Sequence, residues 1–165
     1  MAEINNILRN VSVWVDGRGY AGEATQVSLP EVNIQTEEFR PGGRDAPVEL
    51  DMGMEAMEAS LQFGSVEKGI IGSVGKEIPI TVRGATRDRD GTVHPVRAEL
   101  TGRVKSLETG DWQPGERSTT TLTLSVDYYR MEMDGDEVLE IDIPNMVRRV
   151  DGEDQLGDMR EALGL

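Results

Sequence analysis

The sequence of this 165-residue chain predicts a single, mainly β domain built from antiparallel strands. Residues 117–129 alternate strictly, with a polar set on one side of a strand and an apolar set on the other. Shorter runs of the same alternation occur elsewhere, and Asp-Gly pairs typical of hairpin turns separate several of them. The 19 glycines and seven prolines are spread along the chain, which indicates many turns rather than one flexible tail.

The first expected elements are two short strands and a long loop. Alternation over residues 11–15 ends at the turn signal Asp16-Gly17. After the break at Leu29-Pro30, a second alternating run covers residues 32–37. Residues 40–47 contain two prolines that flank a Gly-Gly pair, so they cannot lie inside a strand. We expect an exposed loop there, a kind of segment that often carries contacts.

Residues 54–63 fit either a helix, through Met54, Met57 and Leu61, or a strand, through alternation that ends at Phe63. We favour the strand because strands are expected on both sides. A short helix is expected around residues 65–73. Its N-cap would be Ser65, and its inward-facing residues would be Val66, Ile70 and Ile71.

The second half of the chain contains the longest expected strands. Alternation over 78–85 is followed by a strand at about 96–105, in which Val96, Ala98, Leu100 and Val104 face one way and Arg97, Glu99, Thr101, Arg103 and Lys105 the other. A loop over 110–116 carries Trp112, which we expect to anchor that loop by packing.

The strand at 117–129 follows this loop, and its thirteen residues would extend roughly 40 Å. Its packed side would carry Leu122, Leu124, Val126 and Tyr128. Asp134-Gly135 then predicts a hairpin that returns through Val138, Leu139 and Ile141.

A C-terminal helix is expected around residues 153–163, with Asp151 as a possible cap. Leu156, Met159 and Leu163 would form its apolar stripe, and Gly164 would end it.

The composition excludes several classes of protein. Hydrophobic residues make up 37% and aromatic residues only 4%, so the core must be aliphatic and thin. Acidic residues number 31 against 17 basic ones, and the basic residues do not cluster as nucleic-acid binding requires. The absence of cysteine excludes disulfides and thiolate chemistry. The first ten residues do not resemble a signal peptide, and no apolar run is long enough to be a membrane anchor.

The sequence offers no catalytic residue, metal site or cofactor motif. The single histidine, His94, has no cysteines for a zinc site and no nearby nucleophile, so a structural or surface role is expected. Asp88–Gly91 and Asp134–Glu137 look like fragments of a calcium loop. Both lack a third oxygen ligand and a distal glutamate at the required spacing, so we expect hairpin turns. We therefore expect a protein that is not an enzyme.

A series of short motifs nevertheless runs through the chain in a fixed order. In the N-terminal half they are Asp16-Gly17, Tyr20, Gly22, Leu29-Pro30, Thr36-Glu37, Arg40, Gly42-Gly43, Asp45-Ala46-Pro47-Val48 and Leu50-Asp51-Met52-Gly53. In the C-terminal half they are Gly102-Arg103, Lys105, Gly110-Asp111-Trp112, Gly115-Glu116, Tyr128-Tyr129, Glu140-Ile141-Asp142, Asn145, Val147, Gly152, Asp154-Gln155-Leu156 and Ala162-Leu163-Gly164-Leu165. In this combination the chain resembles the major tail tube proteins of contractile-tailed phages, and equally the tube proteins of R-type bacteriocins.

The resemblance implies a single antiparallel β-barrel or sandwich-like tail tube domain over residues 1–165. Such subunits form hexameric rings that stack helically into a rigid inner tube within a contractile sheath. The tube is the conduit for genome delivery and the shaft that sheath contraction drives through the envelope. The implied partners are other copies of the chain, the tail sheath protein, baseplate or tube-initiator proteins and tail terminator proteins. The tape measure protein and DNA would occupy the lumen transiently, and the virion tail would be assembled in the cytoplasm of the bacterial host.

Three sets of residues are candidate functional sites under this resemblance. The inter-ring contact loop consists of Arg40, Pro41, Gly42, Gly43, Asp45 and Pro47. The wet wall face consists of Thr119, Thr121, Thr123, Ser125 and Asp127, where DNA would find few cations for its phosphates; the sequence leaves open whether it faces the bore or the sheath. The candidate sheath-facing residues are Glu153, Asp154, Asp158 and Glu161, for which a plain solvated helix face is an equal alternative.

Two other functions stay open at this point. A bacteriocin or secretion-type tube without DNA cargo would have the same wall. A monomeric acidic β domain that binds carbohydrate or calcium belongs to a different class, and the scarcity of aromatic residues and the incomplete calcium loops speak against it.

Overall fold

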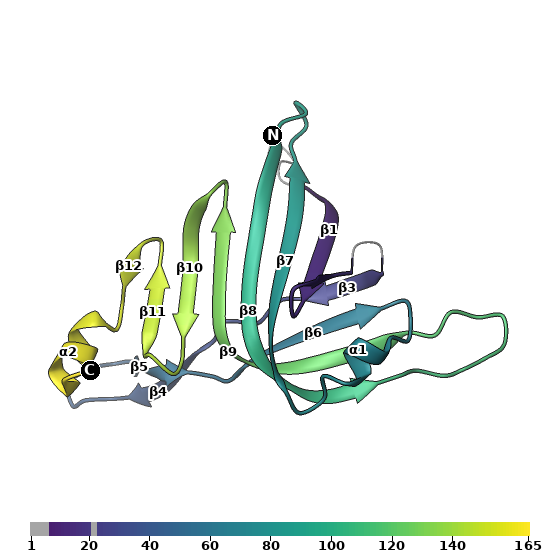
Figure 1. Cartoon of the computed structure of the whole chain (residues 1–165). Coiled ribbons are helices and arrows are strands. Elements are labelled where there is room, and N and C mark those ends of the chain that lie inside the picture. The colour runs from purple at the N-terminus through teal and green to yellow at the C-terminus, as the bar shows by residue number, and fades with distance from the viewer. Residues whose placement is uncertain (1–6, 21–22) are drawn as a thin grey trace.

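The computed structural model describes residues 7–20 and 23–165, in which short helices accompany a β structure (Figure 1). Gly22, one of the residues that carry the family resemblance, lies outside the described residues. The strands are β1 (Ile7–Val15), β2 (Arg18–Gly19), β3 (Ala24–Ser28), β4 (Ile34–Phe39), β5 (Val48–Met54), β6 (Met57–Phe63), β7 (Glu77–Arg87), β8 (Val93–Glu108), β9 (Thr120–Met133), β10 (Asp136–Asp142), β11 (Val147–Val150) and β12 (Glu153–Asp154). The helices are α1 (Lys68–Ile71) and α2 (Gly157–Leu163).

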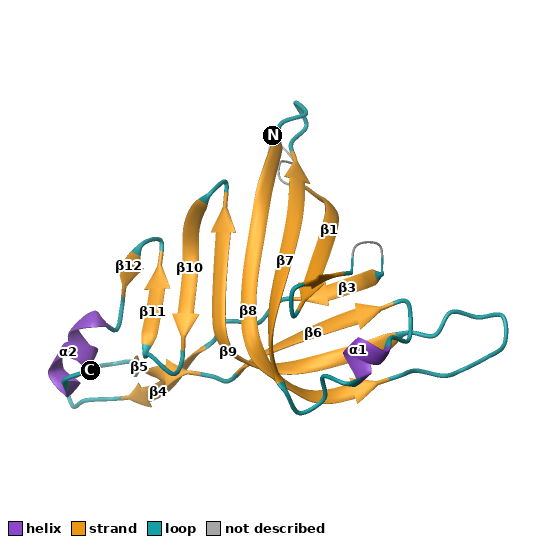
Figure 2. Cartoon of the chain, in the orientation of Figure 1, coloured by secondary structure: helices purple, strands orange, loops and turns teal. Residues whose placement is uncertain are grey.

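Two long strands, β8 and β9, connect the two halves of the main sheet. In one half the strand order is β12-β11-β10-β9-β8-β7-β1-β2. In the other half β6 pairs with residues 120–126 of β9, and β3 pairs with the far side of β6. All of these pairs are antiparallel, and the two halves form a sandwich-like arrangement (Figure 2). Within the described residues the sheet does not close into a barrel, which refines the barrel or sandwich expectation.

The sheet bends where Gly102 of β8 crosses β9. Thr101 pairs with Tyr128 and Gly102 with Val126, so Asp127 is an extra residue, a β-bulge. A Cβ added at Gly102 would lie 2.3 Å from the backbone oxygen of Ser125, a distance that no side chain tolerates. Glycine therefore allows the close backbone approach that the bend requires.

The bulge changes which tyrosine enters the core. Alternation predicted Tyr128 on the packed side, but Tyr129 is buried and Tyr128 is half-buried on the opposite face. The extra residue at Asp127 shifts the alternation by one position, so every side chain beyond it changes face. Burial raises the pKa of Tyr129 to about 12.

The core lies between the two halves of the sheet and is aliphatic, as the composition predicted. One half contributes residues such as Val13, Ile80 and Leu100, and the other contributes Leu61 and Leu122. Phe63 and Tyr20 add an edge-to-face aromatic pair with ring centroids 5.4 Å apart. The favoured strand at 54–63 is found as β6 from Met57, with Met57, Ala59, Leu61 and Phe63 buried in alternation, whereas Met54 ends β5.

Both predicted helices are shorter than expected. α1 covers four residues, Ser65 does not cap it, and Ile70 is buried whereas Val66 and Ile71 are exposed. Its glycine-rich surroundings favour one turn over a longer helix.

At the C-terminus, Asp151 and Gly152 both have positive φ and turn the chain back along β11. Residues 153–154 therefore form β12 rather than the first turn of a helix, and Asp151 is no helix cap. Gly164 ends α2 in the left-handed conformation, as predicted. No helix in the described ranges has the length and apolar character needed to cross a membrane.

Candidate functional site

The β4–β5 hairpin forms a two-stranded sheet of its own and carries the predicted contact loop at its tip. Large apolar side chains on it are exposed, among them Phe39 at 56% and Met52 at 55%. An isolated two-stranded hairpin is marginally stable in water. Exposed apolar patches of this kind typically mark interaction surfaces. The hairpin is therefore the strongest candidate for a contact with another protein surface.

The loop from Arg40 to Pro47 is exposed apart from the half-buried Pro41. The guanidinium of Arg40 braces it by donating a hydrogen bond to the backbone oxygen of Asp45 at 3.1 Å. Gly43 has a φ of 88°, which suits glycine at a tight turn. The six predicted loop residues thus lie together at one hairpin tip.

One ion pair fixes the base of this hairpin to the rest of the fold. Nη2 of Arg148, on β11, donates to a carboxylate oxygen of Asp51, on β5, at 2.6 Å. Arg148 is buried, and its guanidinium, together with the backbone N–H of Gly53, holds the pKa of Asp51 below its usual value. Sequence reasoning missed this pair because its partners are far apart along the chain.

A face rich in hydroxyl and amide groups covers the solvent side of the β3, β6 and β9 strands. We call it the hydroxyl face and define it as Gln26, Ser28, Ser60, Gln62, Ser106, Thr121 and Thr123. The pairing places Ser28, Ser60, Thr123 and Ser106 in one row across four strands. It places Gln26, Gln62, Thr121 and the acidic Glu108 in the next row.

Most of the predicted wet wall lies on this surface. Thr121 and Thr123 belong to the hydroxyl face, and Ser125 follows between Glu58 and Arg103. Thr119 precedes β9, and Asp127 is exposed at the bulge. The strand therefore presents three of the five predicted residues on one face.

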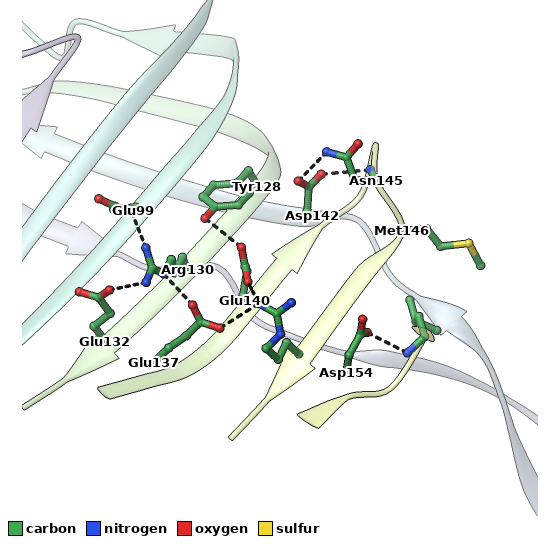
Figure 3. Close-up of polar contacts among 12 residues, drawn as sticks. Glu99, Tyr128, Arg130, Glu132, Glu137, Glu140, Asp142, Asn145, Met146 and Asp154 are labelled. Atoms are coloured by element: carbon green, nitrogen blue, oxygen red, sulfur yellow. Dashed lines mark hydrogen bonds and ion pairs between the residues drawn. The ribbon is translucent and has the colours of Figure 1, made fainter. Parts of the chain in front are cut away.

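A different surface covers the solvent side of strands β8 to β12. Cross-strand pairing aligns Glu99, Arg130, Glu140, Arg149 and Asp154, a row of alternating charge that we call the charge ladder. Figure 3 shows the side chains of these strands pointing toward one another. Opposite charges directly across strands stabilise a sheet.

Arg130 is the centre of this ladder. Its guanidinium contacts Glu132 at 2.6 Å, Glu137 at 2.8 Å and Glu99 at 3.8 Å (Figure 3). Arg149 pairs with Glu137 and Glu140, and the hydroxyl of Tyr128 donates to Glu140 at 3.3 Å. The charges are thus largely neutralised within the sheet. The charged residues of each strand can be read from the sequence, but the strand register that aligns them across the sheet cannot.

The four predicted sheath-facing acids do not share one helix. Glu153 and Asp154 lie on β12, whereas Asp158 and Glu161 lie on α2. Asp154 pairs with Arg160, whose guanidinium holds the pKa of that carboxyl below its usual value. Glu153, Asp158 and Glu161 are exposed.

Trp112 does not pack as its loop's anchor. Its side chain is 70% exposed in the connection between β8 and β9, so that expectation was wrong. A backbone hydrogen bond stabilises the turn in this loop without the indole, because the N–H of Glu116 donates to the oxygen of Gln113 at 3.2 Å.

His94 joins two hairpin turns. Its ring nitrogens lie 3.0 Å from carboxylate oxygens of Asp88 and Asp134, which belong to the β7–β8 and β9–β10 connections. The protonated ring donates hydrogen bonds to the carboxylates of Asp134 and Asp88, which raises the pKa of His94. Both calcium-like fragments are hairpin turns, as expected, and the described side chains include no group of three acids, histidines or cysteines placed to hold a metal.

Comparison with protein families gives a match over nearly the whole chain. The family model described as phage tail tube protein FII matches residues 5–164. The tail tube protein of Escherichia phage P2 is 31% identical over 166 residues, covering 96% of each chain. The major tail tube protein of Serratia phage KSP20 is 30% identical over 163 residues, covering 96% of this chain and 95% of its own.

Two solved structures have a similar fold. A chain of the PVC sheath-tube complex, an extracellular contractile injection system in its extended state, aligns with a TM-score of 0.60 at 16% identity, covering 79% of this chain and 93% of that one. A chain of the anti-feeding prophage baseplate aligns with a TM-score of 0.51 at 14% identity, covering 80% and 95%. At these identities the likeness concerns the fold.

Proposed function

The chain belongs to the phage tail tube protein FII family, and from this premise we propose that six copies form a ring and that rings stack into the rigid inner tube of a contractile tail. The tube is the conduit for genome delivery and the shaft that the contracting sheath drives through the envelope. The role is structural, and the protein is a component of the virion tail.

The observation that carries this proposal is the exposed apolar β4–β5 hairpin. Phe39, Leu50 and Met52 are all close to half exposed or more, which is an unusual surface for a protein that stays monomeric. Stacking would bury these side chains against the next ring. The braced loop from Arg40 to Pro47 sits at the tip of the hairpin and would make the inter-ring contact.

The hydroxyl face is the better candidate for the tube lumen. Its hydroxyl and amide groups carry no charge, so DNA passing over them would release few counterions and bind weakly. Four carboxylates, two from the charge ladder and those of Glu132 and Glu137 beside it, surround Arg130 and Arg149, and this charged surface suits a wall that faces other proteins. On this arrangement Thr121 and Thr123 line the bore.

The relatives and structural neighbours indicate which partners to expect. One neighbour is a chain of a sheath-tube complex and another is a chain of a baseplate. We infer that this tube contacts a sheath protein on its outside, through exposed acids such as Asp158 and Glu161, and initiator and terminator proteins at its ends. The tape measure protein and then DNA would occupy the lumen.

Electron microscopy of the purified protein in negative stain tests the proposal directly. We expect rings with six-fold symmetry, or tubes made of such rings, because copies would bury the hairpin against one another. A particle that stays monomeric at every concentration and salt tested would contradict the proposal.

Deletion of Gly42–Asp45 tests the contact loop separately. This variant should fold and form rings but not stacked tubes, because the hairpin tip would no longer reach the next ring. A matched control deletes residues of the β7–β8 turn instead. Normal tubes from the Gly42–Asp45 deletion would show that the loop does not make the inter-ring contact.

A tube without DNA cargo, as in R-type bacteriocins, is the second candidate function. The contractile injection system among the structural neighbours is the observation in its favour. Capsid genes beside the gene for this chain would support the phage tail, and their absence would support the second function.

A further inference from the structure

The connection between β8 and β9, residues 109–119, is an ordered arm that presents an exposed tryptophan. At its base Gly110 has a φ of +64°, and a Cβ there would lie 2.9 Å from the backbone oxygen of Thr119. Only glycine permits this pinched base. The turn at Gln113–Glu116 orders the far end of the arm. Trp112 is 70% exposed on it, although a large aromatic side chain gains most from burial.

An apolar groove of about 700 Å³ lies elsewhere on the molecule, between β5, the β10–β11 turn and α2. Its apolar lining consists of Met52, Met54, Ile143, Met146, Leu156 and Met159. Met52, Ile143 and Met159 are each half exposed or more.

The groove is held open by polar contacts at its edges. Arg160 donates to the backbone oxygen of Met146 at 2.9 Å, which ties α2 to the turn. Met146 has a positive φ, a conformation rare for a residue with a side chain, and Figure 3 shows it pointing away from the ladder strands. The site is therefore built before any partner arrives.

The chemistry of the groove suits a tryptophan ring. Methionine side chains adapt to aromatic rings, and their sulfur atoms make favourable contacts with ring edges. Arg148 lies in the groove wall, and its Nε has no hydrogen-bond partner among the described residues. That Nε is buried, and the guanidinium already pairs with Asp51 at 2.6 Å. Asp51 and Asp142 also line the groove, so it is the apolar methionine lining that suits the arm.

The arm and the groove lie at opposite ends of the molecule. In Figure 1 the β8–β9 connection projects on the right, whereas α2, β5 and β11 lie on the left. One chain cannot fill its own groove, so a contact between arm and groove would join two copies head to tail. The groove also borders the β4–β5 hairpin, which carries the proposed inter-ring loop.

We propose that Trp112 of each subunit inserts into the methionine-lined groove of a subunit in the adjacent ring. This inference rests on the proposed tube function and adds a specific anchor to its stacking contact. The arm alone is too small for a stable interface, which buries roughly 1,200–2,000 Å² in total. Trp112 is the anchor within a larger surface that includes the hairpin.

Cross-linking between two introduced cysteines tests the contact. The natural chain has no cysteine, so in the double variant Gln113→Cys, Met159→Cys only the introduced thiols react. Tubes of this variant are treated with a short bismaleimide linker and run on a denaturing gel. We expect a ladder that continues past six chains, because a contact between stacked rings joins subunits along the tube. The single variants should give no ladder.

The outcomes separate this inference from the proposed function. Tubes that form but give no ladder, or a ladder that stops at six chains, would overturn the inference and leave the tube function intact. Failure of the natural chain to form rings or tubes would instead overturn the proposed function.

A second variant removes the anchor without introducing thiols. Trp112→Ala should raise the protein concentration needed for stacking about 30-fold, the change expected on truncating an interface residue worth about 2 kcal/mol. Trp112→Phe should restore most of the stacking. The control Val93→Ala removes another exposed apolar group, 58% exposed, from the opposite end of β8 and should leave the concentration needed for stacking unchanged. Unchanged stacking by Trp112→Ala would overturn the proposal.

Discussion

The hydroxyl face and the charge ladder share strands β8 and β9, but they present different groups to solvent. The first half of β9 presents Thr121 and Thr123 beside serines and glutamines of its neighbours. The second half presents Arg130, surrounded by three glutamates. A neutral face interacts weakly with any charged polymer, whereas a ladder of paired charges adds cross-strand stability. Strand β9 thus carries uncharged polar groups in its first half and a stabilising network of ion pairs in its second half.

The bend between these faces depends on Gly102, and replacing it should have the largest effect. Gly102→Ala would place a Cβ 2.3 Å from a backbone oxygen, so the two strands must separate. We expect a loss of about 3 kcal/mol in the free energy of unfolding, measured by urea denaturation. The control Gly42→Ala has no atom within 4 Å of the added Cβ and should be neutral. An unchanged urea midpoint for Gly102→Ala would show that the bend does not need glycine.

Removing the centre of the ladder should have the next largest effect. Arg130→Met leaves Glu99, Glu132 and Glu137 close together without their cation. We expect a loss of about 1–2 kcal/mol at low salt, shrinking as added salt screens the glutamates. The matched change on the hydroxyl face, Thr123→Val, should cost less than about 0.5 kcal/mol. Equal losses of unfolding free energy in both variants would show that the two faces do not differ in their contribution to stability.

Accessibility in assembled tubes would sharpen the difference in location. A cysteine in place of Thr123 should react with a bulky maleimide an order of magnitude more slowly than one in place of Glu132, because the proposed bore would shield the hydroxyl face. Both should react at similar rates after the tubes are dissociated. Fast labelling at position 123 in intact tubes would place the hydroxyl face outside.

The smallest expected effect is a pH dependence of stability that arises from His94, which joins the β7–β8 and β9–β10 turns. Asp134 and Asp88 raise the pKa of His94, so the stabilisation they provide is complete below its ordinary pKa and is lost as pH rises through the raised value. The melting temperature should therefore decline slightly between about pH 6 and 8. His94→Gln should flatten that decline, and His94→Gln with an unchanged slope would assign the titration to other groups. Thr121→Val serves as the control on the other face.

Local patterns were sufficient to predict most strands. Alternation identified β8 and β9, and Asp134-Gly135 identified the turn into β10. The bulge at Asp127 was not visible, because the alternation of residue types continues through it while the backbone does not. Only the close approach of Gly102 to the neighbouring strand reveals it, and that contact is non-local.

The C-terminus shows a prediction that failed although its signal was present. Asp151-Gly152 is the same kind of turn signal as Asp134-Gly135, and both adopt positive φ. Helical spacing of later apolar residues outweighed it in the sequence, so β12 was taken for the start of a helix. Trp112 was placed in a packed loop because large aromatic residues are usually buried, and nothing local indicates that this arm leaves the core.

The directions of four neighbouring strands have a further consequence. Along β3, β6, β9 and the end of β8 every neighbour is antiparallel, so the two outer strands of this set run in opposite directions. If identical copies stood side by side around an axis, β8 of one would meet β3 of the next in antiparallel orientation, because the set has an even number of alternating strands. An odd number of strands would have brought parallel edges together at every junction. The parity of this small set therefore lets any number of copies continue a single alternating pattern around an axis.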